Sequence, residues 1–171
     1  MSRVTLTSAQ TDLPRGIVLT SDGRDAIAAR IERLRVDVLD RLRPHLMGPE
    51  RDERDVAEFE RALAESARLE GVLAAARPMP AAPTGRGARV QAGSLVEIES
   101  TARTSRASKA ARPARTRVRI VHPEEATIDE ERISWDSPLA RALLGARAGD
   151  IVEVASPRGP WTCTVRKVLG D

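Results

Sequence analysis

The chain has 171 residues, of which 41% are hydrophobic, so it is long enough for one domain or two small domains with modest cores. Its formal net charge is only +3, and a local cluster of basic residues therefore matters more than the total charge. Phe59, Trp135 and Trp161 are its only aromatic residues. This scarcity argues against single-strand binding by stacking several bases on aromatic side chains.

The sequence favours a cytoplasmic location. Cys163 is the single cysteine, which excludes an intrachain disulfide. Residues 1–15 lack the apolar core of a signal peptide, and no apolar run is long enough to span a bilayer, so we expect neither secretion nor a membrane partner. Residues 1–16 are polar and without a clear period, and they are expected to form a flexible leader.

The first helix is expected to start at residues 20–23, Thr-Ser-Asp-Gly, which are typical of a helix N-terminus. Pro44 should end or kink this helix because it lacks an amide hydrogen. The apolar residues recur at three- and four-residue spacings, which places them on one stripe. They are Ile27, Ile31, Leu34, Val38 and Leu42.

A second apolar stripe follows the turn at 48–55. Its members are Val56, Phe59, Ala62, Leu63, Ser66, Leu69, Leu73 and Ala76. Two comparable amphipathic helices joined by a short turn predict an antiparallel coiled-coil hairpin over residues 17–77. An ordinary bundle fragment or a dimerisation hairpin would give the same pattern.

The turn between the helices is rich in acidic residues. Gly48-Pro49 forces the chain to reverse, and four carboxylates follow within six residues. They are Glu50, Asp52, Glu53 and Asp55. Acidic side chains stabilise a helix N-terminus, which is one explanation. The other is a carboxylate cluster at the end of a rod, delivered into the active site of a partner.

Residues 78–88 are rich in proline and glycine and are expected to be a linker. In residues 89–171, β-like runs occur at 95–98, 118–121, 151–154 and 161–168, and Ser137, Pro138 and Gly145 mark the ends of one short helix. The sequence therefore predicts an α+β chain in which the hairpin precedes a small antiparallel sheet with one short helix.

A basic loop, residues 101–119, lies between the first two expected strands. Its candidate binding residues are Arg103, Arg106, Lys109, Arg112 and Arg115. The loop is either a solvated hairpin tip or an electrostatic contact for nucleic acid or an acidic protein.

Four blocks in the second half resemble the C-terminal domain of Gre-type bacterial transcription elongation factors, in the order of that family: VQAGSLV at 90–96, VHPEEA at 121–126, ISWDSPLARALLG at 133–145 and AGDIVEV at 148–154. LTSDG at 19–23 resembles the helix-opening segment of the same family. The chain is thus identified as a GreA/GreB-like homologue with a divergent tip. The resemblance implies an FKBP-like sheet over 89–171 and a coiled coil before it.

The resemblance also implies a partner, RNA polymerase. In such factors the C-terminal domain docks near the entrance of the secondary channel, and the hairpin reaches down the channel. The candidate docking residues by resemblance are Ser134, Trp135, Asp136, Ser137 and Pro138. Ser137-Pro138 is also a common helix start, and Trp135 is equally suited to a core.

The tip departs from the family. Cleavage factors carry Asp-Leu-x-Glu-Asn-Ala-Glu-Tyr, in which two acids help to hold a second Mg²⁺. Matching this motif to DERDVAEF at 52–59 places Asp52 and Asp55 at the acidic positions, whereas matching the preceding glycine to Gly48 places Pro49 and Asp52 there. Both matches stay open. The hairpin is also expected to be shorter than in cleavage factors.

These features predict a transcription regulator, not an intrinsic enzyme, that inserts its coiled coil into the secondary channel and modulates transcription through its acidic tip; inhibition is favoured over activation. The alternatives are a transcript-cleavage factor and a nucleic-acid-binding module using the basic loop. No cofactor of its own is expected, although the tip would influence Mg²⁺ in the polymerase active site. DNA or RNA within the transcription complex is a further possible partner, and a monomer is sufficient.

Overall fold

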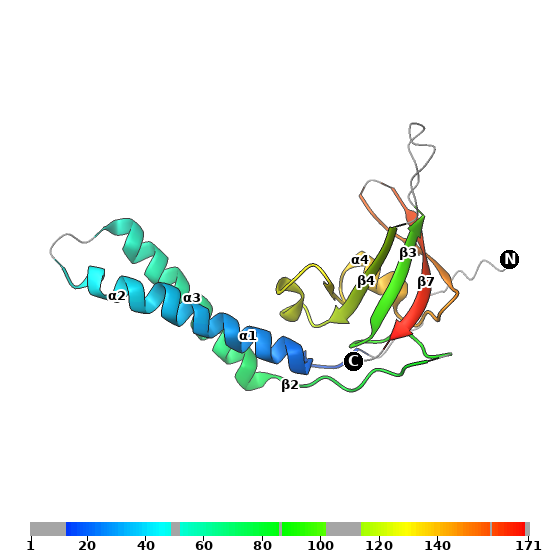
Figure 1. Cartoon of the computed structure of the whole chain (residues 1–171), viewed down its shortest axis with the longest axis horizontal. Helices are drawn as coiled ribbons and strands as arrows, with labels where there is room; N and C mark the ends of the chain where they lie inside the picture. The colour runs from blue at the N-terminus through cyan, green and yellow to red at the C-terminus, as the bar shows by residue number, and fades with distance from the viewer. Residues whose placement is uncertain (1–12, 49–51, 86, 102–113, 158, 170–171) are drawn as a thin grey trace. The chain divides into compact units, whose positions relative to one another are not determined.

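A computed structural model describes residues 13–48, 52–85, 87–101, 114–157 and 159–169. The chain forms two compact units (Figure 1). The helical hairpin is Leu19–Pro78, and the sheet unit comprises the segment that ends at Val18 together with Met79–Asp171. The expected α+β architecture, a helical hairpin followed by a sheet domain, is confirmed.

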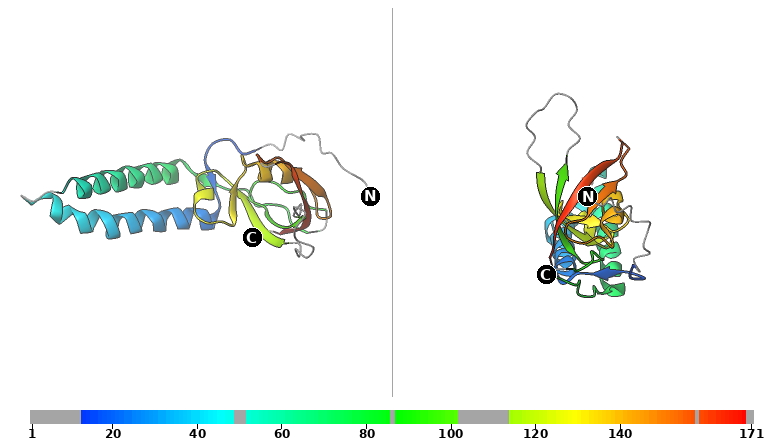
Figure 2. Two further views of the ribbon diagram at one scale, coloured as in Figure 1. Left: turned by 90° about the horizontal axis from the view of Figure 1, so that it is seen from above. Right: turned by 90° about the vertical axis from the view of Figure 1, so that its right-hand side faces the viewer.

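The first arm of the hairpin consists of α1 (Ser21–Arg33), a π-helical segment η1 (Leu34–Asp40) and α2 (Arg41–Leu46). The second arm is α3 (Glu53–Ala75), and the two arms lie side by side in both views (Figures 1 and 2). The helix starts at the predicted place, because the Thr20 Oγ1 accepts a hydrogen bond from the Gly23 backbone N–H at 3.0 Å.

The buried stripe of the hairpin differs from the predicted one in both arms. In the first arm Leu39 is buried and Val38 only half-buried, because the π-helical turn holds more residues than an α-helical turn and rotates the stripe. In α3, Leu63 is 51% exposed and its neighbour Ala62 is buried. The small residues Ala62 and Ser66, both buried, face the first arm at this level, so the larger leucine lies outside the contact.

Pro44 lies inside α2 and the helix continues to Leu46, so the predicted stop comes two residues late. A proline ring in an α-helix meets the carbonyl group four residues earlier, which here belongs to Asp40. Asp40 is the last residue of η1, where the hydrogen-bond pattern is π-helical. The wider π-helical turn thereby accommodates the proline without ending the helix.

The sheet unit contains a five-stranded sheet in the order β5-β4-β3-β7-β6. The strands are β3 (Leu95–Thr101), β4 (Ala114–Val121), β5 (Arg132–Ser134), β6 (Ile151–Val154) and β7 (Trp161–Leu169). The pairs β3–β4, β3–β7 and β6–β7 are antiparallel as predicted. The pair β4–β5 is parallel, so the sheet is mixed and not purely antiparallel. A second, two-stranded sheet pairs β1 (Val18–Leu19) with β2 (Arg77–Pro78).

One face of the sheet carries the core. α4 (Pro138–Leu143) begins at Ser137, whose Oγ accepts a hydrogen bond from the Ala140 backbone N–H at 3.2 Å, and it packs Ala140 and Leu143 into this core. The other buried residues of the core are Val18, Val90, Ala92, Val96, Ile98, Val118, Ile120, Trp135, Ala146, Val152, Val154, Cys163, Val165 and Val168. Burial raises the pKa of the Cys163 thiol to about 11, so the thiol is protonated and structural at neutral pH.

The segments expected as leader and linker contribute to this core. Residues 1–12 lie outside the described residues, but Leu13 packs against the cluster, as do Met79 and Ala88. Gly93 has φ +89°, and a Cβ there would lie 3.1 Å from the Met79 Cγ. The close approach of Met79 to the Gly93 backbone therefore favours glycine at this position.

Candidate functional site

The acidic turn meets α3 at Asp52, the N-cap of the helix. The Asp52 Oδ1 accepts a hydrogen bond from the Arg54 backbone N–H at 2.8 Å, which satisfies one of the free amides at the helix start. Glu53 and Asp55 follow in the first turn, where the helix dipole favours negative charge. Asp52 and Glu53 are exposed and Asp55 is half-exposed, while Glu50 lies outside the described residues. Helix-start chemistry thus accounts for part of the cluster.

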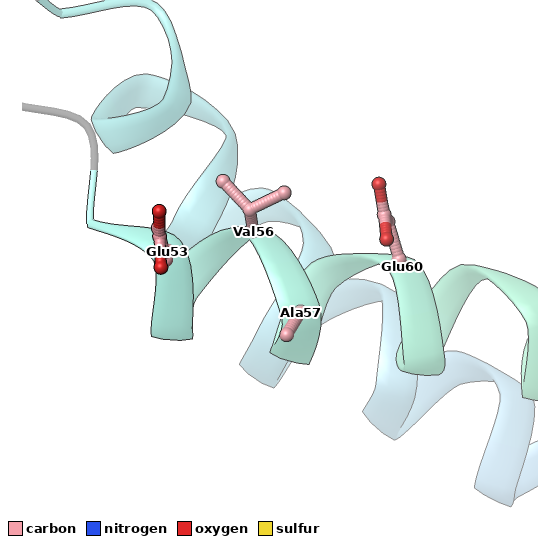
Figure 3. A pocket seen from close by; sticks show the side chains of 4 residues that line it. All are labelled: Glu53, Val56, Ala57 and Glu60. Carbon is pink, nitrogen blue, oxygen red and sulfur yellow. The ribbon is translucent and has the colours of Figure 1, made fainter.

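A shallow hollow lies on α3 just after these residues. It is lined by Glu53, Val56, Ala57 and Glu60. Figure 3 shows the side chains of Glu53, Val56 and Glu60 on the same side of the helix. Glu53 and Glu60 are seven residues apart, roughly 10 Å along the helix axis, and Val56 lies between them. The two carboxylates therefore frame an apolar spot and are too far apart to share one small cation.

No described residues gather into a group of three or more metal-ligating side chains. The described tip acids, Asp52, Glu53 and Asp55, therefore offer negative charge without a metal site of their own. Any Mg²⁺ near them would need further ligands from a partner.

Three ion pairs connect the first arm of the hairpin to α3. The Arg41 guanidinium is 2.8 Å from a Glu58 carboxylate oxygen, and its Nε donates a hydrogen bond to the Asp37 carbonyl at 2.9 Å. Arg30–Glu65 at 3.1 Å and Arg35–Glu70 at 3.6 Å repeat the arrangement further along. In each pair the arginine belongs to the first arm and the glutamate to α3. All of these side chains are well exposed, so each pair adds little to stability.

The candidate docking strip, residues 134–138, connects β5 to α4. Trp135 is 7% exposed and belongs to the core, and Ser137 caps α4. Ser134 accepts a hydrogen bond from the Asp136 backbone N–H through its Oγ at 3.1 Å. Asp136 and Pro138 are exposed, so the strip presents polar and ring surfaces while its tryptophan is buried.

His122 contacts the tryptophan of this strip. Its ring meets that of Trp135 edge-on, with 4.9 Å between centroids and an interplanar angle of 83°. Its Nδ1 accepts a hydrogen bond from the Glu124 backbone N–H at 3.2 Å. Partial burial lowers the pKa of His122, against the opposing effect of nearby carboxylates including Asp136. The ring is therefore neutral at physiological pH and serves to position Trp135.

A buried ion pair in the same region was not identified from the sequence. Glu125 is fully buried in the short 3-10 helix η2 (Glu125–Thr127), and its carboxylate lies 3.2 Å from the Nε of Arg132 on β5. Arg132 also pairs with Asp129. A buried glutamate needs such a partner. No spacing rule connects these residues, although Glu125 belongs to the resembling block at 121–126.

Most of the basic loop, including Arg103, Arg106, Lys109 and Arg112, lies outside the described residues. Arg115 is on β4, and its Nε donates a hydrogen bond to the Glu99 carboxylate on β3 at 3.3 Å. Of the predicted basic residues, Arg115 is thus shown to be part of the sheet. In the residues that the structure describes, no helix has both the length and the apolar character needed to cross a bilayer.

Comparisons with known protein families and with individual proteins both find similarity to Gre-type transcription factors. Residues 86–169 match the family model described as "Transcription elongation factor, GreA/GreB, C-term". The "Transcription inhibitor protein Gfh1" of Thermus aquaticus is 30% identical over 155 residues, which cover 86% of this chain and 92% of that protein.

Other similarities are shorter or looser. The transcription elongation factor GreA of Thermotoga petrophila is 46% identical over 51 residues, or 30% of this chain and 33% of that protein. The crystal structure of the Gfh1 protein of Thermus thermophilus aligns over 91% of this chain and 100% of that one, with 30% identity and a TM-score of 0.39.

Proposed function

The chain belongs to the GreA/GreB family of transcription factors, and from this membership we propose that it binds RNA polymerase and inhibits RNA synthesis without stimulating transcript cleavage. The hairpin enters the secondary channel, and the tip with Asp52, Glu53 and Asp55 acts inside it. The sheet unit docks at the channel entrance through the strip at residues 134–138.

The observation that carries this proposal is the extent of the similarity to a named inhibitor. The similarity to the transcription inhibitor Gfh1 extends over both the hairpin and the sheet unit, whereas the similarity to GreA of Thermotoga petrophila covers 51 residues. A similarity that covers 92% of the named inhibitor supports inhibition as the activity of this chain.

The geometry of the tip supports inhibition over cleavage. A cleavage factor must present acids that complete a second metal site next to the catalytic one. Here one carboxylate oxygen of Asp52 accepts a hydrogen bond from the Arg54 amide, which leaves this side chain fewer lone pairs for a metal ion. The tip places negative charge and bulk in the channel, which obstructs nucleotide entry and perturbs the polymerase Mg²⁺ by Coulomb attraction alone.

The length of the hairpin sets its reach. α3 has 23 residues and is therefore about 35 Å long. This length sets the distance of the tip from the base of the hairpin. The exposed Asp136 and Pro138 provide the docking contact, while the buried Trp135 and the helix cap Ser137 hold the strip in shape.

The test uses purified, backtracked elongation complexes of the cognate polymerase. The full-length protein should bind these complexes and leave the rate of transcript cleavage unchanged within about a factor of two. An increase in cleavage that is lost in Asp52→Asn/Asp55→Asn would overturn the inhibitor proposal and establish a cleavage factor that uses those two acids.

A matched control is available at the other end of the hairpin. Asp22 and Asp25 are exposed, are also three residues apart and lie near the start of α1. The variant Asp22→Asn/Asp25→Asn changes the charge by the same amount without touching the tip. If neither the wild type nor this control bound polymerase, the assignment of the partner itself would fall.

A further inference from the structure

The sheet has a second face, opposite the core, that is rich in basic side chains. In the β3–β4 register Glu97 lies opposite Arg117 and Glu99 opposite Arg115, and directly paired residues point to the same side of a sheet. The buried partners Val96 and Val118 point to the other side. We call the outward set the basic face; it comprises Arg115, Arg117, Arg119, Arg166 and Lys167.

A β-bulge brings two of these residues onto the face. The register between β3 and β7 shifts between Glu97 and Ile98, so that Glu97 lies opposite Lys167 and Ile98 opposite Val165. Arg166 is the extra residue. Arg166 and Lys167 are both exposed and lie between two buried valines. Without the bulge, strict alternation would turn one of the two side chains toward the core.

The face has a surplus of positive charge. Five basic side chains share it with two carboxylates, those of Glu97 and Glu99. Glu99 is bound by Arg166 at 2.8 and 2.9 Å and by Arg115 at 3.3 Å. The hydrogen bond from Arg166 holds the pKa of the Glu99 carboxyl below its ordinary value, so Glu99 stays ionised and fixes both arginines in place.

Arg117 and Lys167 are the cations available to a ligand. Both are exposed and flank Glu97 from opposite sides. Neither forms an ion pair with a described residue, in contrast to Arg115 and Arg166. The face thus combines two oriented arginines with two cations that remain accessible.

We propose that the basic face of β4, β3 and β7 binds the phosphate backbone of double-helical DNA. Along a strand, residues on one face are two positions apart, so Arg115, Arg117 and Arg119 follow one another at roughly 6.7 Å and form a row of cations. A duplex offers regularly repeated negative charges to such a row, and arginine binds phosphate in a planar, bidentate geometry.

The composition of the face favours a duplex over other polyanions. It carries no aromatic side chain on which an unpaired base could stack, which argues against single strands. Its charges come from β4, β3 and β7, which lie next to one another in the sheet (Figure 1), so the backbone of a duplex can contact several of them at once. Contacts of this kind position a protein on DNA without reading its sequence.

The test measures binding of the full-length protein to a labelled 20-base-pair DNA duplex by fluorescence anisotropy, at several salt concentrations and without polymerase. The logarithm of the affinity should fall linearly with the logarithm of the salt concentration. In Arg117→Ala/Lys167→Ala the slope should become less steep by about 1.8, because each lost phosphate contact contributes about 0.9. Arg117→Glu/Lys167→Glu should weaken binding by at least about ten-fold at 100 mM salt.

Two further variants separate this face from other basic residues. Arg89→Ala/Arg147→Ala removes two exposed arginines of the same unit outside the basic face and should leave the slope unchanged. Replacing Arg103, Arg106, Lys109 and Arg112 with alanine tests the loop. Loss of binding in the loop variant, with wild-type binding in Arg117→Glu/Lys167→Glu, would overturn the proposal. Equal or tighter binding to single strands or to poly-glutamate would overturn it as well. Because no polymerase is present, failure here leaves the proposed function untouched.

Discussion

The sheet unit and the helical hairpin are stabilised by different kinds of contact. The sheet unit has a continuous core of buried side chains that includes residues of β3, β4, β6, β7 and α4. The hairpin has a single narrow stripe, including the small residues Ala62 and Ser66, and exposed ion pairs between its arms. The sheet unit is therefore a rigid body suited to docking, whereas the hairpin is a rod whose shape depends on few contacts.

Both tryptophans, Trp135 and Trp161, belong to the sheet unit. Their fluorescence therefore reports on unfolding of that unit, while far-ultraviolet circular dichroism reports mainly on the hairpin helices. Monitoring both signals during denaturation separates the two regions in the full-length protein.

The largest effect is expected in the sheet core. Leu143 is fully buried, and Leu143→Ala should lower the free energy of unfolding by about 3 to 4 kcal/mol through lost transfer energy and a cavity. The fluorescence transition in urea should shift accordingly. Ile151→Ala, at a position of the same unit that is 62% exposed, is the matched control and should change stability by less than about 0.5 kcal/mol.

Glu125→Ala should also destabilise the sheet unit. It removes the buried partner of Arg132, which is 15% exposed and keeps only Asp129, at an expected loss of about 2 to 3 kcal/mol. The fluorescence transition measures this loss. A change below about 0.5 kcal/mol would mean that Arg132 relaxes toward water and that the pair contributes little.

In the hairpin, Leu69→Ala should cost about 2 kcal/mol, less than in the sheet core because the narrow stripe can partly collapse. The circular dichroism transition should shift while the fluorescence transition stays in place. A shift of both signals would show that the two units unfold together, which would contradict their separate stabilisation.

Glu99 predicts a pH dependence of the sheet unit. The pKa of its carboxyl is lowered in the folded state, chiefly by the hydrogen bond from Arg166, so the unfolded state binds more protons as the pH falls. The stabilisation is fully present above about pH 5 and is lost as the pH falls through the lowered pKa. The stability difference between the wild type and Glu99→Gln should therefore shrink between pH 6 and pH 3; a constant difference would contradict this assignment.

The smallest effect is expected at an exposed ion pair. Arg30→Ala removes the partner of Glu65, and since both side chains are well exposed the cost should be about 0.5 kcal/mol. Circular dichroism in low and high salt measures it, and salt should reduce the difference further. A cost above about 2 kcal/mol would assign the arginine stem a packing role that its exposure does not suggest.

The sequence predicts elements whose ends are marked by local chemistry. Thr20 and Ser137 cap helices where the pattern placed them, and the antiparallel pairing of the longer strands was expected. The three residues of β5 are too few to show a period, and their parallel pairing with β4 depends on the loop between them. The π-helical turn that exchanges Val38 for Leu39 likewise leaves no signal in an α-helical pattern.

The candidate site residues also divide into those predictable from local sequence and those that depend on the fold. The position of Asp52 at a helix start could be predicted from the turn, because capping is local. The Glu125–Arg132 pair and the basic face could not, because they depend on strand order and on a bulge where β7 pairs with β3, whose residue Glu97 is 70 positions before its partner Lys167. Arg115 was singled out as part of a loop, whereas its partners on the sheet became visible only in the fold.

The most direct test of the account is multi-round RNA synthesis by the purified cognate polymerase with the wild type, with Asp52→Asn/Asp55→Asn and with the control Asp22→Asn/Asp25→Asn, each at a concentration that saturates binding. The wild type and the control should reduce RNA synthesis. The variant Asp52→Asn/Asp55→Asn should still bind polymerase but should no longer reduce synthesis. Equal inhibition by all three proteins would contradict the claim that the tip acids act while the sheet unit docks.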